Sequence, residues 1–158
     1  MRIALYQPDI APNAGAIFRL ASVLGVEVDL IGPMGFVMSD KKLRRVAMDY
    51  FDSASIWMHN SWHDYLLFRA RSPEANGRIV LLTTSADGNH LDFSYRQADT
   101  LLVGRETAGV PPEVHQGADA RVRIPMVQGR RSLNVVVAAA IVVGEAFRQT
   151  GLWNNLSN

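Results

Sequence analysis

The stretch GRRSLN, residues 129–134, places basic and polar side chains directly before nine apolar residues, Val135–Val143. The apolar run indicates a helix, and the Ser132 hydroxyl can accept a hydrogen bond from a free N–H at its start. Two arginines are unexpected at that end, because the positive end of a helix dipole favours anions. A helix cap therefore explains Ser132 but leaves Arg130 and Arg131 unexplained.

Basic side chains gather in two clusters, although the 158-residue chain has a formal net charge of only +1. The first cluster consists of Lys41, Lys42, Arg44 and Arg45, and the second of Arg121, Arg123, Arg130 and Arg131. On a helix, the four cations of the first cluster would spread over one broad face, with Leu43 facing inward. Such clusters are commonly solvated surface. Two of them in a nearly neutral protein nevertheless favour a phosphate-rich partner.

Other common chemistries have little support in the sequence. The chain has no cysteine, which excludes a disulfide scaffold, thiolate-bound zinc and a cysteine nucleophile. It has no Walker A motif and no GxGxxG after the first predicted strand. Its four histidines are scattered, and His59 and His63 fall at a predicted strand–helix junction, so we expect no metal site. Ser132 lies outside any GxSxG motif.

The composition is that of a globular protein, with 48% hydrophobic and 20% charged residues. Residues 1–158 fit a single domain. The N-terminus, MRIALYQ, has no signal-peptide pattern, and Val135–Val143 is too short to span a bilayer. We therefore expect a cytoplasmic protein without a membrane partner.

Strand-like and helix-like segments alternate along the chain. The predicted strands are Ile3–Tyr6, Val26–Ile31, Ser55–His59, Ile79–Thr83, Leu101–Gly104 and Val122–Pro125. The predicted helices are Ala14–Leu24, Asp40–Met48, Trp62–Ala70 and a long one after Ser132. Asn13 is expected to cap the first helix and Gly25 to close it. This alternation is typical of an α/β fold with a mostly parallel sheet.

Ligands of open α/β sheets bind beyond the carboxyl ends of the strands. The loops after the first, fourth, fifth and sixth predicted strands read QPDIAPNAGAIFR, TTSADGN, GRETAGVPPE and PMVQGRRSLN. Three of them contain glycine, which lets a backbone approach a ligand closely. The functional residues are therefore expected in these loops.

Three segments in this order resemble the signature motifs of the SPOUT, or α/β-knot, methyltransferases. They are NAGAIFR (13–19), LLVGRETAGVP (101–111) and RIPMVQGRRSLNVVVAAA (123–140). PMGF (33–36) and DKKLRR (40–45) narrow the likeness to the small single-domain tRNA (cytidine/uridine-34)-2′-O-methyltransferase group. The resemblance covers essentially the whole chain.

The resemblance implies a Rossmann-like sheet flanked by helices, with a C-terminal trefoil knot. It implies S-adenosylmethionine as methyl donor, a homodimer with its active site at the subunit interface, and the anticodon stem-loop of tRNA as substrate. The reaction would transfer a methyl group to the ribose 2′-hydroxyl of nucleotide 34. The long helix would then bury its apolar residues in the knot and the dimer core.

Residue roles follow from the matching motif positions. Arg19 and Asn13 are the expected catalytic residues, with Arg19 as a cation at the reacting hydroxyl, because a guanidinium is a poor general base. The expected cofactor-binding residues are Leu82, Gly104, Ile124, Met126, Ser132 and Leu133. The expected RNA-binding residues are Lys42, Arg44, Arg45, Arg130 and Asn134, and the alternative role of Asn134 is to cap the helix. Glu106 is expected to accept hydrogen bonds from backbone amides and so to hold the knot loop.

The chain departs from this methyltransferase group at Arg105 and Ala108, in the loop after the fifth predicted strand, which more often reads GPETRG. The RNA contacts of this loop therefore cannot be carried over from the group.

Two other classes of function stay open at this point. One is a non-catalytic RNA-binding or assembly protein with a knotted fold, and the other is a flavodoxin-like nucleotide-binding protein. A 2′-O-methyltransferase acting on another RNA is a further alternative within the leading class.

Overall fold

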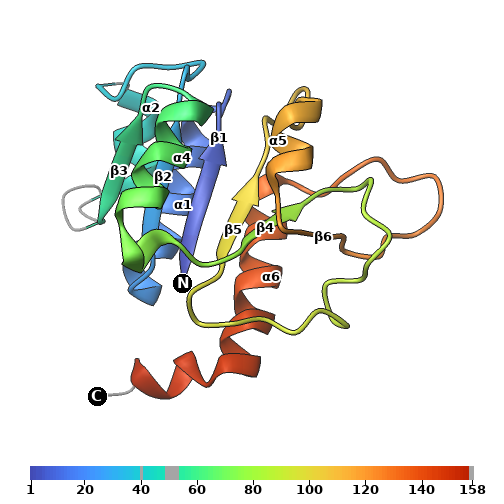
Figure 1. Cartoon of the computed structure of the whole chain (residues 1–158). Coiled ribbons are helices and arrows are strands. Elements are labelled where there is room, and N and C mark those ends of the chain that lie inside the picture. The colour runs from blue at the N-terminus through green and yellow to red at the C-terminus, as the bar shows by residue number, and fades with distance from the viewer. Residues whose placement is uncertain (40, 49–53, 157–158) are drawn as a thin grey trace.

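The computed structural model describes residues 1–39, 41–48 and 54–156, and its centre is a sheet of six parallel strands (Figure 1). The strands are β1 (Arg2–Tyr6), β2 (Glu27–Ile31), β3 (Ile56–His59), β4 (Ile79–Leu82), β5 (Thr100–Val103) and β6 (Ala120–Val122). Their order across the sheet is β3-β2-β1-β5-β4-β6. The first strand therefore lies between β2 and β5, and its loop meets the loops of both neighbours at the carboxyl edge.

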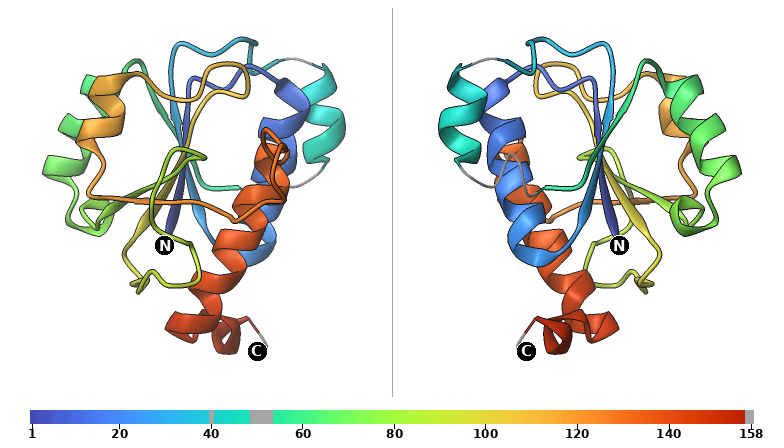
Figure 2. Two further views of the ribbon diagram at one scale, coloured as in Figure 1. Left: turned by 90° about the vertical axis from the view of Figure 1, so that its right-hand side faces the viewer. Right: turned by 90° about the vertical axis from the view of Figure 1, so that its left-hand side faces the viewer.

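Helices cover both faces of the sheet, as the two edge-on views in Figure 2 show. One face carries α1 (Ala11–Leu24), α2 (Lys41–Ala47) and α6 (Val135–Thr150), and the other carries α4 (Trp62–Arg71) and α5 (Pro112–Gly117). Short 3-10 helices span Pro73–Ala75 and Leu152–Asn155. The α/β class expected from the sequence is confirmed. Within the described ranges, no helix is both long and apolar enough to cross a membrane.

The core lies on the two faces of the sheet. Alternate residues of β1 point to opposite faces, so Ile3 and Leu5 pack with α1 and α6. Ala4 and Tyr6 instead join the cluster that contains Tyr65 of α4. Burial on both sides explains why the central strands β1, β4 and β5 are mostly apolar and do not alternate between apolar and polar residues.

Helix α2 packs unusually close to α1, and Gly15 makes this possible. A Cβ at Gly15 would lie 2.7 Å from the carbonyl oxygen of Leu43 and 3.2 Å from the amide nitrogen of Ala47. Leu43 itself is fully buried, as predicted, and the cationic side chains of α2 are exposed. Gly15 thus fixes the position of the basic helix. The predicted start of this helix at Asp40 lies outside the described residues.

Two predictions about helix caps were wrong. Helix α1 begins at Ala11 rather than Ala14, because Pro12 suits the first turn, where no intrahelical N–H is needed. Asn13 is therefore inside the helix and does not cap it, whereas Gly25 closes it in the left-handed conformation as expected. The cap of α6 is Asn134, whose side-chain oxygen accepts from the amides of Val136 and Val137. Ser132 lies two residues before the cap.

The sixth strand is shifted toward the N-terminus of its predicted range, and one helix was missed. Strand β6 pairs with β4, and both strands end together, at Val122 and Leu82. Beyond them in the described residues, Arg123 forms an isolated bridge with Asn89. Helix α5 begins in the segment GRETAGVPPE, which was predicted to be the loop after the fifth strand. Pro112 in fact occupies the first turn, where proline is tolerated.

The trefoil knot stays a prediction, because strand order and helix contacts do not by themselves define a threaded path.

Candidate active site

A pocket of about 490 Å³ opens at the carboxyl edge of the sheet. Its walls come from the start of α1, the segments after β4, β5 and β6, and the first turns of α6. Apolar walls are formed by Ile10, Leu82, Val103, Ile124, Met126, Leu133, Val135 and Ala138. Polar groups are contributed by Asn13, Thr83, Thr84, Arg105, Glu106, Thr107, Ser132 and Asn134. This size and mixture are typical of a site for a small organic ligand.

The loop after β5 forms one rim of the pocket as a tight turn. The amide of Arg105 donates to the carbonyl of Gly109, and the amide of Gly109 donates back to Arg105, both at 2.9 Å. Gly109 has a φ of 66°, in the left-handed region. A Cβ on Gly104 would lie 2.7 Å from the carbonyl carbon of Gly109, so only glycine fits where the turn closes on the strand.

A chain of hydrogen bonds joins the three motif segments at the pocket. The Asn13 amide donates to Glu106 Oε1 at 3.1 Å, and the Asn134 amide donates to Asn13 Oδ1 at 3.2 Å. The second carboxylate oxygen of Glu106 accepts from the amide of Asp9 at 2.9 Å. Glu106 therefore accepts a hydrogen bond from a backbone amide, as predicted, and that amide belongs to the loop after β1.

The Asp9 carboxylate accepts a second set of hydrogen bonds between the same two segments, the loop after β1 and the turn after β5. Its carboxylate accepts from the guanidinium of Arg105, at 2.8 Å from Nη2, and from the Thr107 hydroxyl at 2.5 Å. The hydrogen bond from Arg105 lowers the pKa of the Asp9 carboxyl below its usual value, and the bond from Thr107 contributes less in the same direction. The same pairing raises the pKa of Arg105. The site is thus built on an ionised carboxylate at its rim.

Comparison with known proteins identifies the family. A profile described as the SpoU rRNA methylase family matches residues 1–144. The chain belongs to that family.

Individual relatives resemble this SpoU-family chain in sequence or in fold over most of its length. A tRNA (cytidine(34)-2′-O)-methyltransferase of Beijerinckia indica is 52% identical over 149 residues, which are 94% of this chain and 91% of the relative. A structure described as insights into the 2-OH methylation of C/U34 on tRNA has a TM-score of 0.87 and 34% identity, covering 94% of both chains. The SpoU methyltransferase AviRb from Streptomyces viridochromogenes, in complex with the cofactor AdoMet, has a TM-score of 0.85 and 27% identity, covering 94% of this chain and 60% of that one.

The pocket of the SpoU-family chain gathers most of the predicted site residues. All six predicted cofactor residues line it: Leu82, Gly104, Ile124, Met126, Ser132 and Leu133. Asn13 and Asn134 line it as well. Arg19 does not. It lies farther along α1, exposed, with its Nη1 3.5 Å from the sulfur of Met48. The roles of these residues stay predictions.

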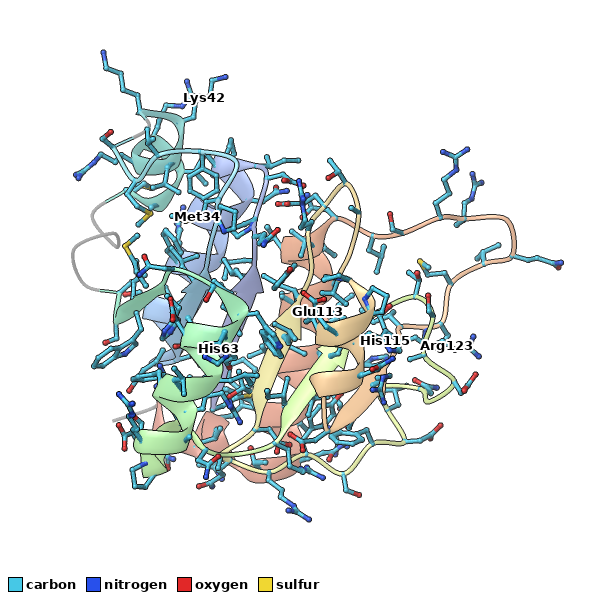
Figure 3. The ribbon with its side chains drawn as sticks, turned by 45° about the horizontal axis from the view of Figure 1, so that its top comes forward. Met34, Lys42, His63, Glu113, His115 and Arg123 are labelled. Atoms are coloured by element: carbon cyan, nitrogen blue, oxygen red, sulfur yellow. The ribbon has the colours of Figure 1, made fainter. Side chains whose placement is uncertain are left out.

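The predicted RNA-binding residues are spread over two surfaces. Lys42, Arg44 and Arg45 are exposed on α2, and Arg130 is exposed in the loop before α6. Figure 3 shows Lys42 pointing outward and Arg123, of the second basic cluster, on the opposite side of the view. The two clusters therefore do not form one patch on a single chain.

Several residues of the site were not singled out from the sequence. Thr83 and Thr84 follow β4 directly, and their position in a loop after a strand was a usable signal. Asp9 also lies in a loop after a strand, but its partners Arg105 and Thr107 are 96 and 98 positions away in the chain and could not be inferred from the sequence. The sequence shows that Arg105 replaces the proline of the group pattern, but the contact of Arg105 with Asp9 could not be predicted from it.

Proposed function

We propose that the chain is an S-adenosylmethionine-dependent methyltransferase that modifies the 2′-hydroxyl of nucleotide 34, cytidine or uridine, in the tRNA anticodon loop. The observation that carries this proposal is that one pocket draws on all three motif segments, which lie far apart in the sequence. The names of relatives that span nearly the whole chain support the substrate. As a tRNA-modifying enzyme, the protein would act in the cytoplasm.

The pocket suits the proposed cofactor in size and chemistry. Leu82, Ile124 and Met126 offer apolar surface for a planar base, and the turn at Gly104 brings main-chain groups to the rim. When bound, S-adenosylmethionine supplies a methyl group on a positively charged sulfur. The contribution of the chain is to hold that methyl group close to the ribose hydroxyl, since positioning alone is worth roughly 7–11 kcal/mol in favourable cases.

Arg19 is the proposed cation beside the reacting hydroxyl. Its guanidinium stays protonated, so it would stabilise developing negative charge on the ribose oxygen and anchor a neighbouring phosphate rather than remove the proton. Asn13, held by Glu106 and Asn134, would orient the ribose at the mouth of the pocket. Arg19 does not line the pocket of its own chain, so a second subunit is needed to bring the two together.

A homodimer is proposed for this reason and because α6 leaves apolar side chains uncovered. Leu133, Val137 and Ile141 are spaced four residues apart, and their exposed fractions are 41%, 49% and 39%. Residues four apart lie on one face of a helix, so Val137 and Ile141 form a stripe that begins beside pocket residue Leu133. A second copy covering this stripe would stand at the pocket, where its Arg19 would reach the substrate.

The proposed RNA surface comprises the exposed cations of α2 together with Arg130 near the pocket. A single-stranded loop can splay its nucleotides into a pocket, whereas the bases of an A-form helix cannot be reached in this way. Phosphates of the anticodon stem would lie along the basic side chains of Lys42, Arg44 and Arg45. In a dimer, α2 of one subunit and the pocket of the other would then share one substrate.

The test is mass spectrometry of tRNA from a strain lacking the gene. We expect loss of the 2′-O-methyl nucleoside at position 34 and its return with the wild-type gene, but not with an Arg19→Ala variant. The family profile is described for rRNA methylases, so rRNA is the second candidate substrate. Loss of an rRNA 2′-O-methyl group, with tRNA unchanged, would contradict the proposal and favour that alternative.

A further inference from the structure

The carboxylate of Asp9 holds the rim of the pocket from outside. Asp9 is absent from the pocket wall, and its side chain is only 15% exposed. Its Oδ1 accepts from Arg105 Nη2 at 2.8 Å and Nε at 3.2 Å, and its Oδ2 accepts from the Thr107 hydroxyl at 2.5 Å and, more weakly, from the Thr107 amide at 3.4 Å. Bidentate binding of a guanidinium to a carboxylate adds directional specificity to the attraction of the charges.

The two joined segments hold each other reciprocally. Asp9 accepts from the 105–107 segment, and its own amide donates to Glu106 of that segment at 2.9 Å. The turn from Arg105 to Gly109 is closed by its own pair of backbone bonds. The turn therefore moves as a unit, and the contacts with the loop after β1 fix where that unit stands.

The Asp9 backbone is itself well anchored. Gly35 donates its amide to the carbonyl of Pro8 at 3.0 Å, and a Cβ on Gly35 would lie 2.9 Å from the carbonyl oxygen of Asp9. The loop after β1 is thus packed against the segment after β2. Because these contacts restrain the Asp9 backbone, its carboxylate is a fixed point to which the turn is attached.

We propose that Asp9 is a positioning residue for the cofactor. Its ion pair with Arg105 and its hydrogen bonds with Thr107 hold the 105–109 turn in the conformation that binds S-adenosylmethionine. This inference rests on the proposed function of the pocket. The guanidinium of Arg105, although part of the pocket wall, is engaged by Asp9 and serves the turn rather than the ligand.

The test measures binding of S-adenosylhomocysteine by calorimetry, with no catalytic turnover. We expect Asp9→Asn and Arg105→Ala each to weaken binding by on the order of threefold to tenfold, as for a partly exposed charge network. The double variant should be no weaker than the weaker single variant, because both changes break the same contact. The gap between wild type and Asp9→Asn should narrow in about 1 M salt, where the ion pair is screened.

Two further variants keep the result interpretable. Thr107→Val removes the hydroxyl bond to Asp9 while keeping the shape of this pocket-wall side chain, and it should weaken binding by about twofold to threefold. Glu145→Gln is the matched control, since it breaks an ion pair with Arg148 of the same 2.8 Å length on α6, away from the pocket. We expect its ligand affinity to equal that of the wild type.

Equal affinity of wild type and Asp9→Asn would overturn the proposal. Additive losses from Asp9→Asn and Arg105→Ala would also overturn it, because they would mean that Arg105 contacts the ligand directly. Failure of the wild type to bind S-adenosylhomocysteine is a separate outcome, and it would refute the proposed function of the pocket itself.

Discussion

Two inactive variants should restore each other's activity if Arg19 acts in the pocket of the partner subunit. Arg19→Ala removes the cation but leaves the pocket lining unchanged. Gly104→Ala keeps Arg19 but adds a Cβ that would lie 2.7 Å from the Gly109 carbonyl carbon, so the rim turn must move. Each variant alone should lose roughly 100-fold or more in methyl transfer. Only Gly104→Ala should also lose cofactor affinity, with Arg19→Ala staying within a few-fold of the wild type.

The size of the recovery follows from two-fold symmetry. A dimer with one subunit of each variant contains one intact pocket, in the Arg19→Ala subunit, and one intact Arg19, in the Gly104→Ala subunit. If Arg19 crosses the interface, these two meet and the mixed dimer has about half of the wild-type activity. The assay is methyl transfer to tRNA by mixed dimers purified through two different affinity tags on co-expressed subunits.

The reciprocal dimer gives the opposite result and serves as the control. It pairs a wild-type subunit with one that carries both Arg19→Ala and Gly104→Ala. With Arg19 acting across the interface, neither pocket is complete and the dimer should be inactive. If this dimer keeps about half of the activity and the first mixed dimer has none, Arg19 serves its own pocket and the reasoning is refuted.

Three further predictions concern RNA affinity, helix packing and the interface. Lys42→Ala with Arg45→Ala should weaken tRNA binding and lower the slope of log affinity against log salt concentration by roughly one to two, with cofactor affinity unchanged. A salt titration of tRNA binding measures this slope. Equal slopes for the wild type and the double variant would mean that these cations do not contact the RNA. Gly15→Ala should displace α2, because the new Cβ would lie 2.7 Å from the Leu43 carbonyl oxygen. This displacement should lower both the Tm and the tRNA affinity. A variant with wild-type values of both would contradict this role of the glycine. Val137→Asp should convert the dimer to a monomer in light scattering, because it puts a charge in the apolar stripe, and a dimer of unchanged stability would place the interface elsewhere.

Local sequence signals predicted most of the fold because they depend on near neighbours in the chain. The strands are rich in apolar residues, and the bounds of all but the last agree with the predicted ranges to within one residue. Leu43 was predicted to face inward from its position among four cations, and it is fully buried. The predicted N-cap of α1 was wrong for an equally local reason, whereas Gly25 closes that helix as predicted. Pro12 allowed α1 to start three residues early, and this moved Asn13 from the cap into the helix.

The site was only partly predictable, because its contacts join residues that are distant in sequence. Asp9 and Arg105 are 96 positions apart, and each taken alone looks like an ordinary charged loop residue. The resemblance supplied the motif positions, but it could not supply a contact made by an arginine that stands where the group pattern has proline. That contact became visible only with the loops in place.

The strand order explains why these particular loops make one site. β1 pairs with β5, so Asp9, in the loop after β1, and Asn13, in the first turn of α1, lie beside the turn that carries Arg105 and Glu106. β4 pairs with β5 on the other side and adds Leu82, and α6 returns to the same face and closes the pocket with Asn134. If another strand separated β1 from β5, every motif could be intact and the pocket would still lack its hydrogen-bonded rim. The chemistry of the motifs therefore depends on the order of the strands as much as on the residues they contain.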